Sequence, residues 1–171
     1  MLTKDSDLKK VLLKLKEFSN WDSPLSHGKG RGVGQWEFFA GICAQAVEVT
    51  YNADKSIKVD KVYAVIDLGV AVNPDNVKNQ TEGAIVMALG AATKPGITLE
   101  NGKVQQHNFY DSPLPRINEI PQVEVLILTG DGKIKGVGEP GLPAFAPALA
   151  NAIFAATGTR IRRMPFDLRM T

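Results

Sequence analysis

The residues best placed to do chemistry lie in one short stretch, Lys135-Gly136-Val137-Gly138-Glu139-Pro140-Gly141. Glycines near Glu139 accept backbone angles closed to other residues, while Pro140 fixes its own φ and restricts the residue before it. Residues 140–159 include no ionisable side chain, so Glu139 borders apolar material, which favours uptake of a proton by its carboxylate. The stretch therefore predicts a general base held in a set direction. The alternative is a helix-start turn whose glutamate favours the amide dipole.

Composition limits the classes of function and of binding site that are open to the chain. With 171 residues, 44% hydrophobic and 22% charged, the chain is expected to form one domain with a real core. The net charge of +2 and the scattered Lys and Arg residues do not indicate nucleic-acid binding. A single cysteine, Cys43, excludes an internal disulfide, and with only two histidines no protein-ligated metal cluster is predicted. Cys43 lies in an apolar stretch and is interpreted as a small core residue.

The sequence gives no indication of a membrane span. Its first residues have no signal-peptide pattern, and the most apolar segment, 140–159, is broken by prolines and dominated by small residues. The compartment is therefore unassigned; the cytoplasm is the default and the periplasm stays open.

Several elements must position the glycine-rich stretch. Residues 8–18 carry apolar side chains at helical spacing, with Asp5 or Ser6 as the cap, and residues 23–34 have the composition of a connector. Residues 42–51 and 57–67 alternate as strands around the turn 52–55 and predict a β-hairpin. Residues 33–39 are expected to add a third strand.

Two further helices are predicted. Asn73-Pro74-Asp75 is a strong helix start, and this helix is expected to run to about residue 89 and stop at Gly90. Its second turn carries Gln80 and Gly83, where a glycine lets another group approach closely. An exposed glutamine with no function is the alternative for Gln80. The last helix, about residues 143–157, is apolar all round, so it is expected to be buried on most sides. Gly158 is expected to be its C-cap.

The middle of the chain is less regular. Asn101-Gly102 predicts a tight hairpin, residues 107–120 are irregular, and residues 123–128 form a strand. His107 lies in the irregular part, where a lone histidine is more often exposed or hydrogen-bonded than an acid–base group. Arg160, Arg162 and Arg163 after the last helix are expected to be a solvated helix end. The whole pattern predicts an α+β fold in residues 1–171, with a largely antiparallel sheet and about three helices.

Four motifs follow one another along the chain, namely Asp67-Leu68-Gly69, Asn73-Pro74, Gln80-Thr81-Glu82-Gly83 and Gly136-Val137-Gly138-Glu139-Pro140. In this order and spacing they resemble the C-terminal segment of molybdenum hydroxylase large subunits, the xanthine dehydrogenase and aldehyde oxidase family. Residues 141–143, 146–153 and 157–162 are most similar to the isoquinoline 1-oxidoreductase β-subunit branch. The resemblance covers nearly the whole chain from Leu8 onward.

This resemblance implies a molybdenum–pyranopterin cofactor and hydroxylation of an aromatic N-heterocycle or an aldehyde with oxygen derived from water. By resemblance, Glu139 matches the catalytic base, Gln80 matches a position beside the pterin, and Gly138 brings backbone close to the metal centre. The dinucleotide form of the pterin is left open. Iron–sulfur clusters on a partner subunit are expected to accept the electrons.

The chain also departs from the family. Large subunits run several times this length, so the chain is expected to be a C-terminal piece of the molybdopterin-binding region, inactive by itself, whose partners include the missing N-terminal part of the subunit. Met87 stands where xanthine dehydrogenases have a second glutamine. Apolar groups near Leu142, Phe145 and Phe154 are expected to be exposed or covered by self-association. The alternative function is a non-catalytic assembly or scaffold domain that keeps the fold.

Overall fold

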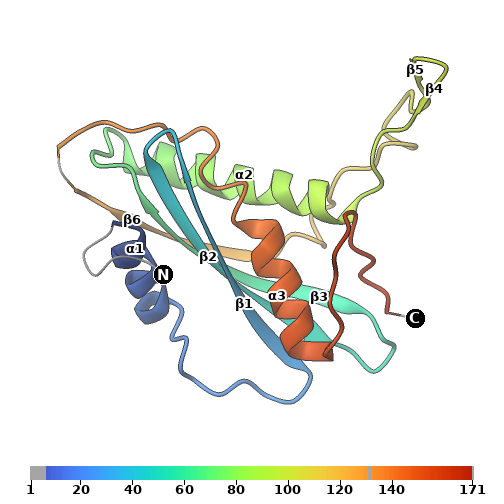
Figure 1. Cartoon of the computed structure of the whole chain (residues 1–171), viewed down its shortest axis with the longest axis horizontal. Helices are drawn as coiled ribbons and strands as arrows, with labels where there is room; N and C mark the ends of the chain where they lie inside the picture. The colour runs from blue at the N-terminus through green and yellow to red at the C-terminus, as the bar shows by residue number, and fades with distance from the viewer. Residues whose placement is uncertain (1–6, 131, 171) are drawn as a thin grey trace.

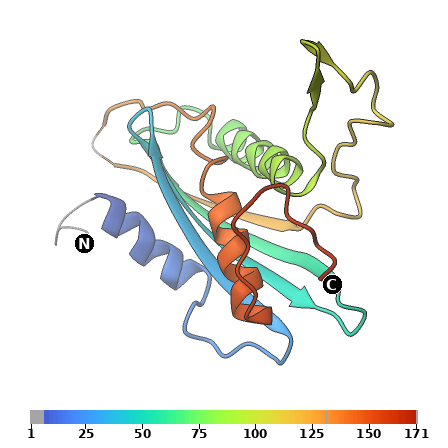
Figure 2. The ribbon, with the colours of Figure 1, turned by 45° about the vertical axis from the view of Figure 1, so that its right-hand side comes forward.

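The computed structural model describes residues 7–130 and 132–170, and it is an α+β fold as predicted. A sheet lies between one helix, α1, on one face and two helices, α2 and α3, on the other (Figure 1, Figure 2). The helices are α1 (Asp7–Phe18), α2 (Pro74–Thr93) and α3 (Phe145–Thr157). The strands are β1 (Lys29–Phe38), β2 (Gly41–Tyr51), β3 (Ile57–Asp67), β4 (Leu99–Glu100), β5 (Lys103–Val104) and β6 (Gln122–Leu128).

The main sheet has the strand order β1-β2-β3-β6. The β2–β3 hairpin predicted from the alternating pattern is confirmed, and β1 pairs antiparallel with β2. β6 lies parallel to β3, with Ala64 opposite Val125, because the chain crosses over through α2 before it returns to the sheet. The sheet is therefore largely antiparallel, as predicted, with one parallel edge strand.

Strand alternation divides the core in two. Cys43, Val47 and Ile66 face α2 and α3, while Ala44 and Val65 face α1. Cys43 is a buried core residue, as predicted, and burial raises the pKa of its thiol to about 12. The α1 helix supplies Val11 and Leu15 to the second cluster; its predicted caps, Asp5 and Ser6, lie outside the described residues.

The interpretation of residues 23–34 as a connector is wrong for its last part, because β1 begins at Lys29. Gly30, Gly32 and Gly34 alternate along one face of the strand, and the backbone of α3 lies directly against them. A Cβ atom on Gly32 would lie 2.2 Å from the Ala148 carbonyl oxygen. The glycines that suggested a loop are there so that α3 can approach the sheet closely.

The start of α2 is confirmed and its end is not. The Asn73 side chain accepts a hydrogen bond from the Asn76 backbone N–H, and Pro74 occupies the first turn. The helix continues past Gly90 to Thr93, because Lys94 still donates its backbone N–H to the Gly90 carbonyl. Gly90 instead lies where Pro115 packs, since a Cβ there would be 3.1 Å from that ring.

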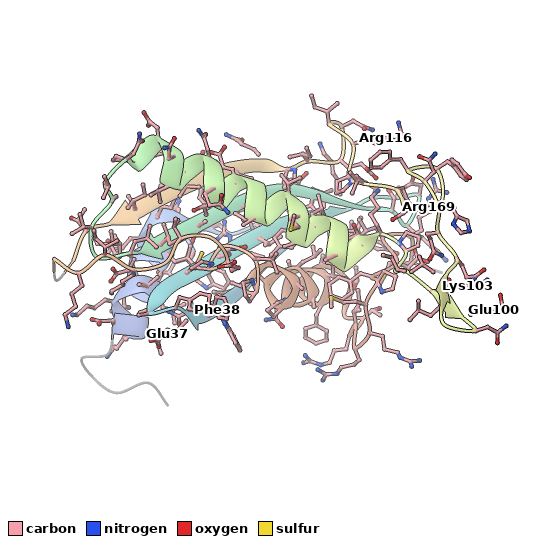
Figure 3. All side chains as sticks on the ribbon, turned by 90° about the horizontal axis from the view of Figure 1, so that it is seen from above. Glu37, Phe38, Glu100, Lys103, Arg116 and Arg169 are labelled. Carbon is pink, nitrogen blue, oxygen red and sulfur yellow. The ribbon has the colours of Figure 1, made fainter. Side chains whose placement is uncertain are left out.

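Residues 97–120 form an arm that projects beyond the end of α2 and then returns to it, where Pro115 packs on Gly90 and Glu119 pairs with Lys94 (Figure 1, Figure 2). Its hairpin turns at Asn101 and Gly102, both with positive φ, as the sequence predicts. Figure 3 places Glu100 and Lys103 at the tip of the arm, at the opposite end of the molecule from Glu37 and Phe38. Large apolar side chains are exposed along the arm, and they are Ile97, Leu99, Val104, Phe109, Tyr110, Leu114 and Ile117.

The expected exposure of the α3 region is partly wrong. Phe145 is fully buried between the sheet and α2, because its helix packs against the glycines of β1. Leu142 and Phe154 are half-buried, and the Arg160 guanidinium lies 3.8 Å from the centre of the Phe154 ring. The helix ends at Gly158 in a left-handed conformation, as predicted. In the described parts of the chain, no helix is long and apolar enough to cross a membrane.

Candidate functional site

The predicted stretch 135–141 runs beside the turn that joins β1 and β2 (Figure 1). Lys135 fixes where it begins. Its ammonium lies 3.4 Å from the Asp67 carboxylate at the end of β3, and both side chains are largely buried. The Lys135 backbone N–H also donates to the Leu68 carbonyl at 3.1 Å. The entry to the loop is therefore tied to the sheet by a side chain and by the backbone.

The β1–β2 turn supports the middle of the loop. Phe39 and Ala40 make this turn with φ of 48° and 61°, a left-handed conformation that non-glycine residues seldom adopt. The Gly136 N–H donates a hydrogen bond to the Phe39 carbonyl, with 3.4 Å between nitrogen and oxygen. A Cβ on Gly41 would lie 2.7 Å from the Gly136 carbonyl oxygen, so glycine is needed where the two segments meet.

Glu139 lies in a turn whose other residues are buried or half-buried. Leu142 donates its N–H to the Glu139 carbonyl at 2.9 Å, and Pro140 and Gly141 are buried. The Glu139 side chain is exposed. The apolar border expected around its carboxylate is thus not formed by this chain, because the uncharged residues that follow pack against the sheet and α2 instead.

The structure brings the two predicted cofactor-binding residues together. The Gln80 side-chain amide donates to the Gly138 carbonyl at 2.7 Å, across 58 residues of sequence. Gln80 is exposed on α2, and its contact reaches the residue immediately before Glu139. A Cβ added to Gly138 or to Gly83 would meet nothing within 4 Å, so both glycines face open space. Gln80, Gly138 and Glu139 therefore form one continuous exposed surface.

One residue of this region was missed by the sequence analysis. Gln45 in β2 is fully buried, and its Nε2 donates to the Gly141 carbonyl at 2.5 Å. Its neighbours are apolar on both faces of the strand, from Ile42 to Val47. An uncharged amide in the middle of such a run is the signal that could have identified it, since buried polar groups require partners.

The remaining candidates lie elsewhere. His107 is exposed on the arm, where its backbone N–H donates to Asp111. The N–H groups of His107 and Asn108 hold the pKa of the Asp111 carboxyl below its usual value, so this cluster stabilises the arm. Met87 is 66% exposed on α2. Among the described residues, no group of three His, Cys, Asp or Glu side chains is placed to hold a metal ion.

Comparison with known proteins identifies the family. The molybdopterin cofactor-binding domain family matches residues 7–121. The isoquinoline 1-oxidoreductase subunit beta of Brevundimonas diminuta is 30% identical over 159 residues, which cover 91% of this chain and 20% of that protein. The aldehyde oxidoreductase molybdenum-binding subunit PaoC of Escherichia coli K12 is 34% identical over 143 residues, covering 78% of this chain and 19% of PaoC.

A solved structure agrees in fold. The quinoline 2-oxidoreductase of Pseudomonas putida 86 superposes with a TM-score of 0.66 and 23% identity, over 73% of this chain and 17% of that chain. The chain thus spans about a fifth of the length of the curated relatives it matches. It belongs to the molybdopterin cofactor-binding domain family, as a segment of a molybdenum hydroxylase large subunit.

Proposed function

We propose that this chain forms one wall of the molybdenum–pterin site in a hydroxylase, with Glu139 as the general base. The observation that carries the proposal is the hydrogen bond from Gln80 to the Gly138 carbonyl. It joins the residue expected beside the pterin to the loop expected beside the metal, and Glu139 is the next residue along that loop. A carboxylate that is exposed to a bound group and fixed to a well-anchored turn is suited to accept a proton from that group.

The residues present fit a large, flat cofactor. Gly83 and Gly138 leave open space where side chains would otherwise stand, so a ring system is able to approach the backbone. Gln80 uses one N–H for the Gly138 carbonyl, and its amide still has an oxygen and a second N–H to offer. A pterin, with donors and acceptors along its edge, suits such an amide. Gln80 and Gly138 are therefore the residues of this chain that would hold it.

When bound, the cofactor would supply the oxidation chemistry, with oxygen taken from water. The chain's own residues would manage geometry and protons. Glu139 would take up a proton at its carboxylate. Gln80 would keep the Gly138 peptide in place, and the Lys135–Asp67 pair would fix the entry to the loop. Water exclusion would come from other parts of the full subunit, because Glu139 is exposed here.

The substrate class proposed is an aromatic N-heterocycle or an aldehyde, which is supported by the names of two relatives, an isoquinoline oxidoreductase and an aldehyde oxidoreductase. The proposed electron acceptor is an iron–sulfur subunit, since several relatives are named as subunits. Residues 1–171 are proposed to be a single domain, the C-terminal piece of the molybdopterin-binding region. The relatives are about five times longer than the part they share with this chain.

A non-catalytic assembly domain is the second candidate. The exposed apolar arm favours it, because such surfaces usually contact other chains. The two functions differ in what they require of Glu139. An assembly domain tolerates its loss, whereas the catalytic domain does not.

The test is the Glu139→Gln substitution in the complete, metal-loaded enzyme. It keeps the size of the side chain and removes the proton acceptor. We expect single-turnover reduction of the metal centre to slow by about 10²–10⁴-fold while substrate affinity changes little. Molybdenum content, measured on the same sample, must stay at the wild-type level for the rate to be interpreted.

Glu37→Gln provides the matched control, because Glu37 is an exposed carboxylate on β1 outside the loop. It should reduce at the wild-type rate. A Glu139→Gln enzyme that retains its metal and also reduces at the wild-type rate would remove Glu139 from the mechanism and favour the assembly domain.

A further inference from the structure

Gln45 differs from the other buried polar side chains among the described residues. Ser19, the residue after α1, donates its hydroxyl to a carbonyl of α1 at 2.7 Å, and Thr81 donates to a carbonyl of its own helix, α2, at 2.8 Å. Gln45 instead reaches the Gly141 carbonyl, 96 residues away in sequence, at 2.5 Å. Its bond therefore ties the centre of the sheet to a distant loop, whereas the two hydroxyls stabilise only α1 and α2.

The carbonyl that Gln45 holds lies two residues after Glu139. Gly141 is packed against α2, since a Cβ there would lie 3.2 Å from the Ala84 methyl group and 3.3 Å from Thr81. The turn is closed by the Leu142 N–H on the Glu139 carbonyl. A shift of the Gly141 peptide therefore changes the direction of Glu139, because few bonds separate the two.

An apolar residue would serve packing better at position 45. Its neighbours on the same face, Cys43 and Val47, belong to the apolar core. The Gln45 Oε1 is fully covered and has no hydrogen-bond partner in the described residues, while its Nε2 also contacts the Cys43 sulfur at 3.7 Å. A covered, unpaired amide oxygen destabilises a fold. Stability is therefore not the advantage of this residue, and its one strong contact is the Gly141 carbonyl.

We propose that Gln45 is a positioning residue for Glu139. It acts through the Gly141 carbonyl and fixes the turn that carries the carboxylate. Gln80 donates to the Gly138 carbonyl, so two amides, from β2 and α2, hold backbone carbonyls on either side of Glu139 in the sequence. The effect on catalysis rests on the proposed function, whereas the two hydrogen bonds are a property of this chain.

The hold of Gln45 on the loop, through its hydrogen bond to the Gly141 carbonyl, is tested first in the chain itself, by NMR and amide hydrogen exchange. In the wild type, an NOE between the Gln45 side-chain amide and the Gly141 α-protons is expected. Gln45→Met keeps the length of the side chain and removes the donor. We expect the Leu142 amide to exchange at least about tenfold faster in this variant, while β3 amides keep their protection. Absence of the NOE, or unchanged Leu142 exchange, would overturn the proposal.

Ser19→Ala is the control, because it also removes a buried polar group but lies in the α1 region, away from the loop. Its Leu142 exchange should match the wild type. If Ser19→Ala speeds Leu142 exchange as much as Gln45→Met does, general loosening explains the result and the proposal fails. The NOE needs no substitution, so the proposal stays testable even if Gln45→Met does not fold.

The consequence for catalysis is measured in the metal-loaded enzyme. We expect Gln45→Met to slow single-turnover reduction by roughly 10–100-fold, with KM within about twofold of the wild type and full molybdenum content, because small displacements of a catalytic group have effects of this size. A wild-type rate beside a slow Glu139→Gln enzyme would refute the positioning role alone. A wild-type rate in both variants would refute the proposed base. The exchange result would still decide whether Gln45 holds the loop through the Gly141 carbonyl.

Discussion

At the residue scale, the exposed surface around Glu139 depends on amide side chains that reach backbone carbonyls. Gln80 is exposed on α2 and Gln45 is buried in β2, yet both donate to carbonyls of the same loop. The difference in burial separates their effects. Losing a buried donor leaves its carbonyl unsatisfied, whereas water replaces an exposed one.

This difference leads to a prediction for Gln80→Leu. In the 171-residue chain the free energy of unfolding should fall by about 1 kcal/mol or less, because the donor is exposed and water is able to satisfy the Gly138 carbonyl. In the complete enzyme we expect reduced molybdenum content, because the proposed contact with the pterin is also lost. Chemical denaturation and metal analysis measure the two effects.

Asn79→Leu is the comparison, since Asn79 is also exposed on α2. It makes the same change from amide to apolar side chain one position away. Full metal content in Gln80→Leu, or equal loss in both variants, would contradict a role for Gln80 at the cofactor.

At the element scale, the packing of α3 on β1 determines where the loop ends. Gly30, Gly32 and Gly34 give α3 a surface without side chains, and the helix backbone occupies that space. The loop leads directly into α3, so the position of this helix fixes the exit of the loop as Lys135 fixes its entry. Elements far from Glu139 thus contribute to its geometry.

Gly32→Ala should therefore destabilise the chain. The new methyl group would lie 2.2 Å from backbone atoms of Ala148 and Ala152, so α3 must move. We expect a loss of about 1–3 kcal/mol in the free energy of unfolding, the range for overpacking, or more because the obstacle is backbone. Denaturant titration followed by circular dichroism measures it.

Gly83→Ala supplies the opposite case. Gly83 lies within α2, where an added Cβ meets nothing within 4 Å, so the chain should gain about 0.5–1 kcal/mol from helix propensity. If Gly32→Ala is as stable as the wild type, α3 does not pack on β1 as closely as described.

At the scale of the whole molecule, apolar surface is concentrated on the arm and not around α3. Phe109 and Tyr110 are 76% and 81% exposed, and Ile117 is 91% exposed, while Phe145 is fully buried. Local hydrogen bonds hold parts of the arm in shape, including Thr98 with Gln106. A shaped apolar projection is typical of an element that contacts another chain or domain.

We therefore predict that the isolated chain binds a hydrophobic dye and self-associates as its concentration rises. The combined substitutions Phe109→Ser and Ile117→Ser should reduce both effects, because they remove exposed apolar area without touching the core. Sedimentation velocity and dye fluorescence measure this. A chain that is monomeric at high concentration and binds no dye would show that the arm is not such a surface.

The sequence by itself determined the local elements with strong chemical signals. The β2–β3 hairpin followed from alternation, the start of α2 from Asn73 and Pro74, and the end of α3 from Gly158, because each depends on neighbours in the chain. The order of the motifs also determined the family. Glu139 was identified as the candidate base from its glycines and proline, from the uncharged run that follows it and from the family resemblance; that role stays a prediction.

Tertiary structure decided the rest. The strand at Lys29 was hidden because its glycines serve contact with α3, which lies more than a hundred residues away in sequence. The contact of Gln45 with Gly141 and the exposure of Glu139 were hidden for the same reason. Hydrogen-bond partners and burial depend on which distant segments meet, and a residue's neighbours in the chain do not specify that.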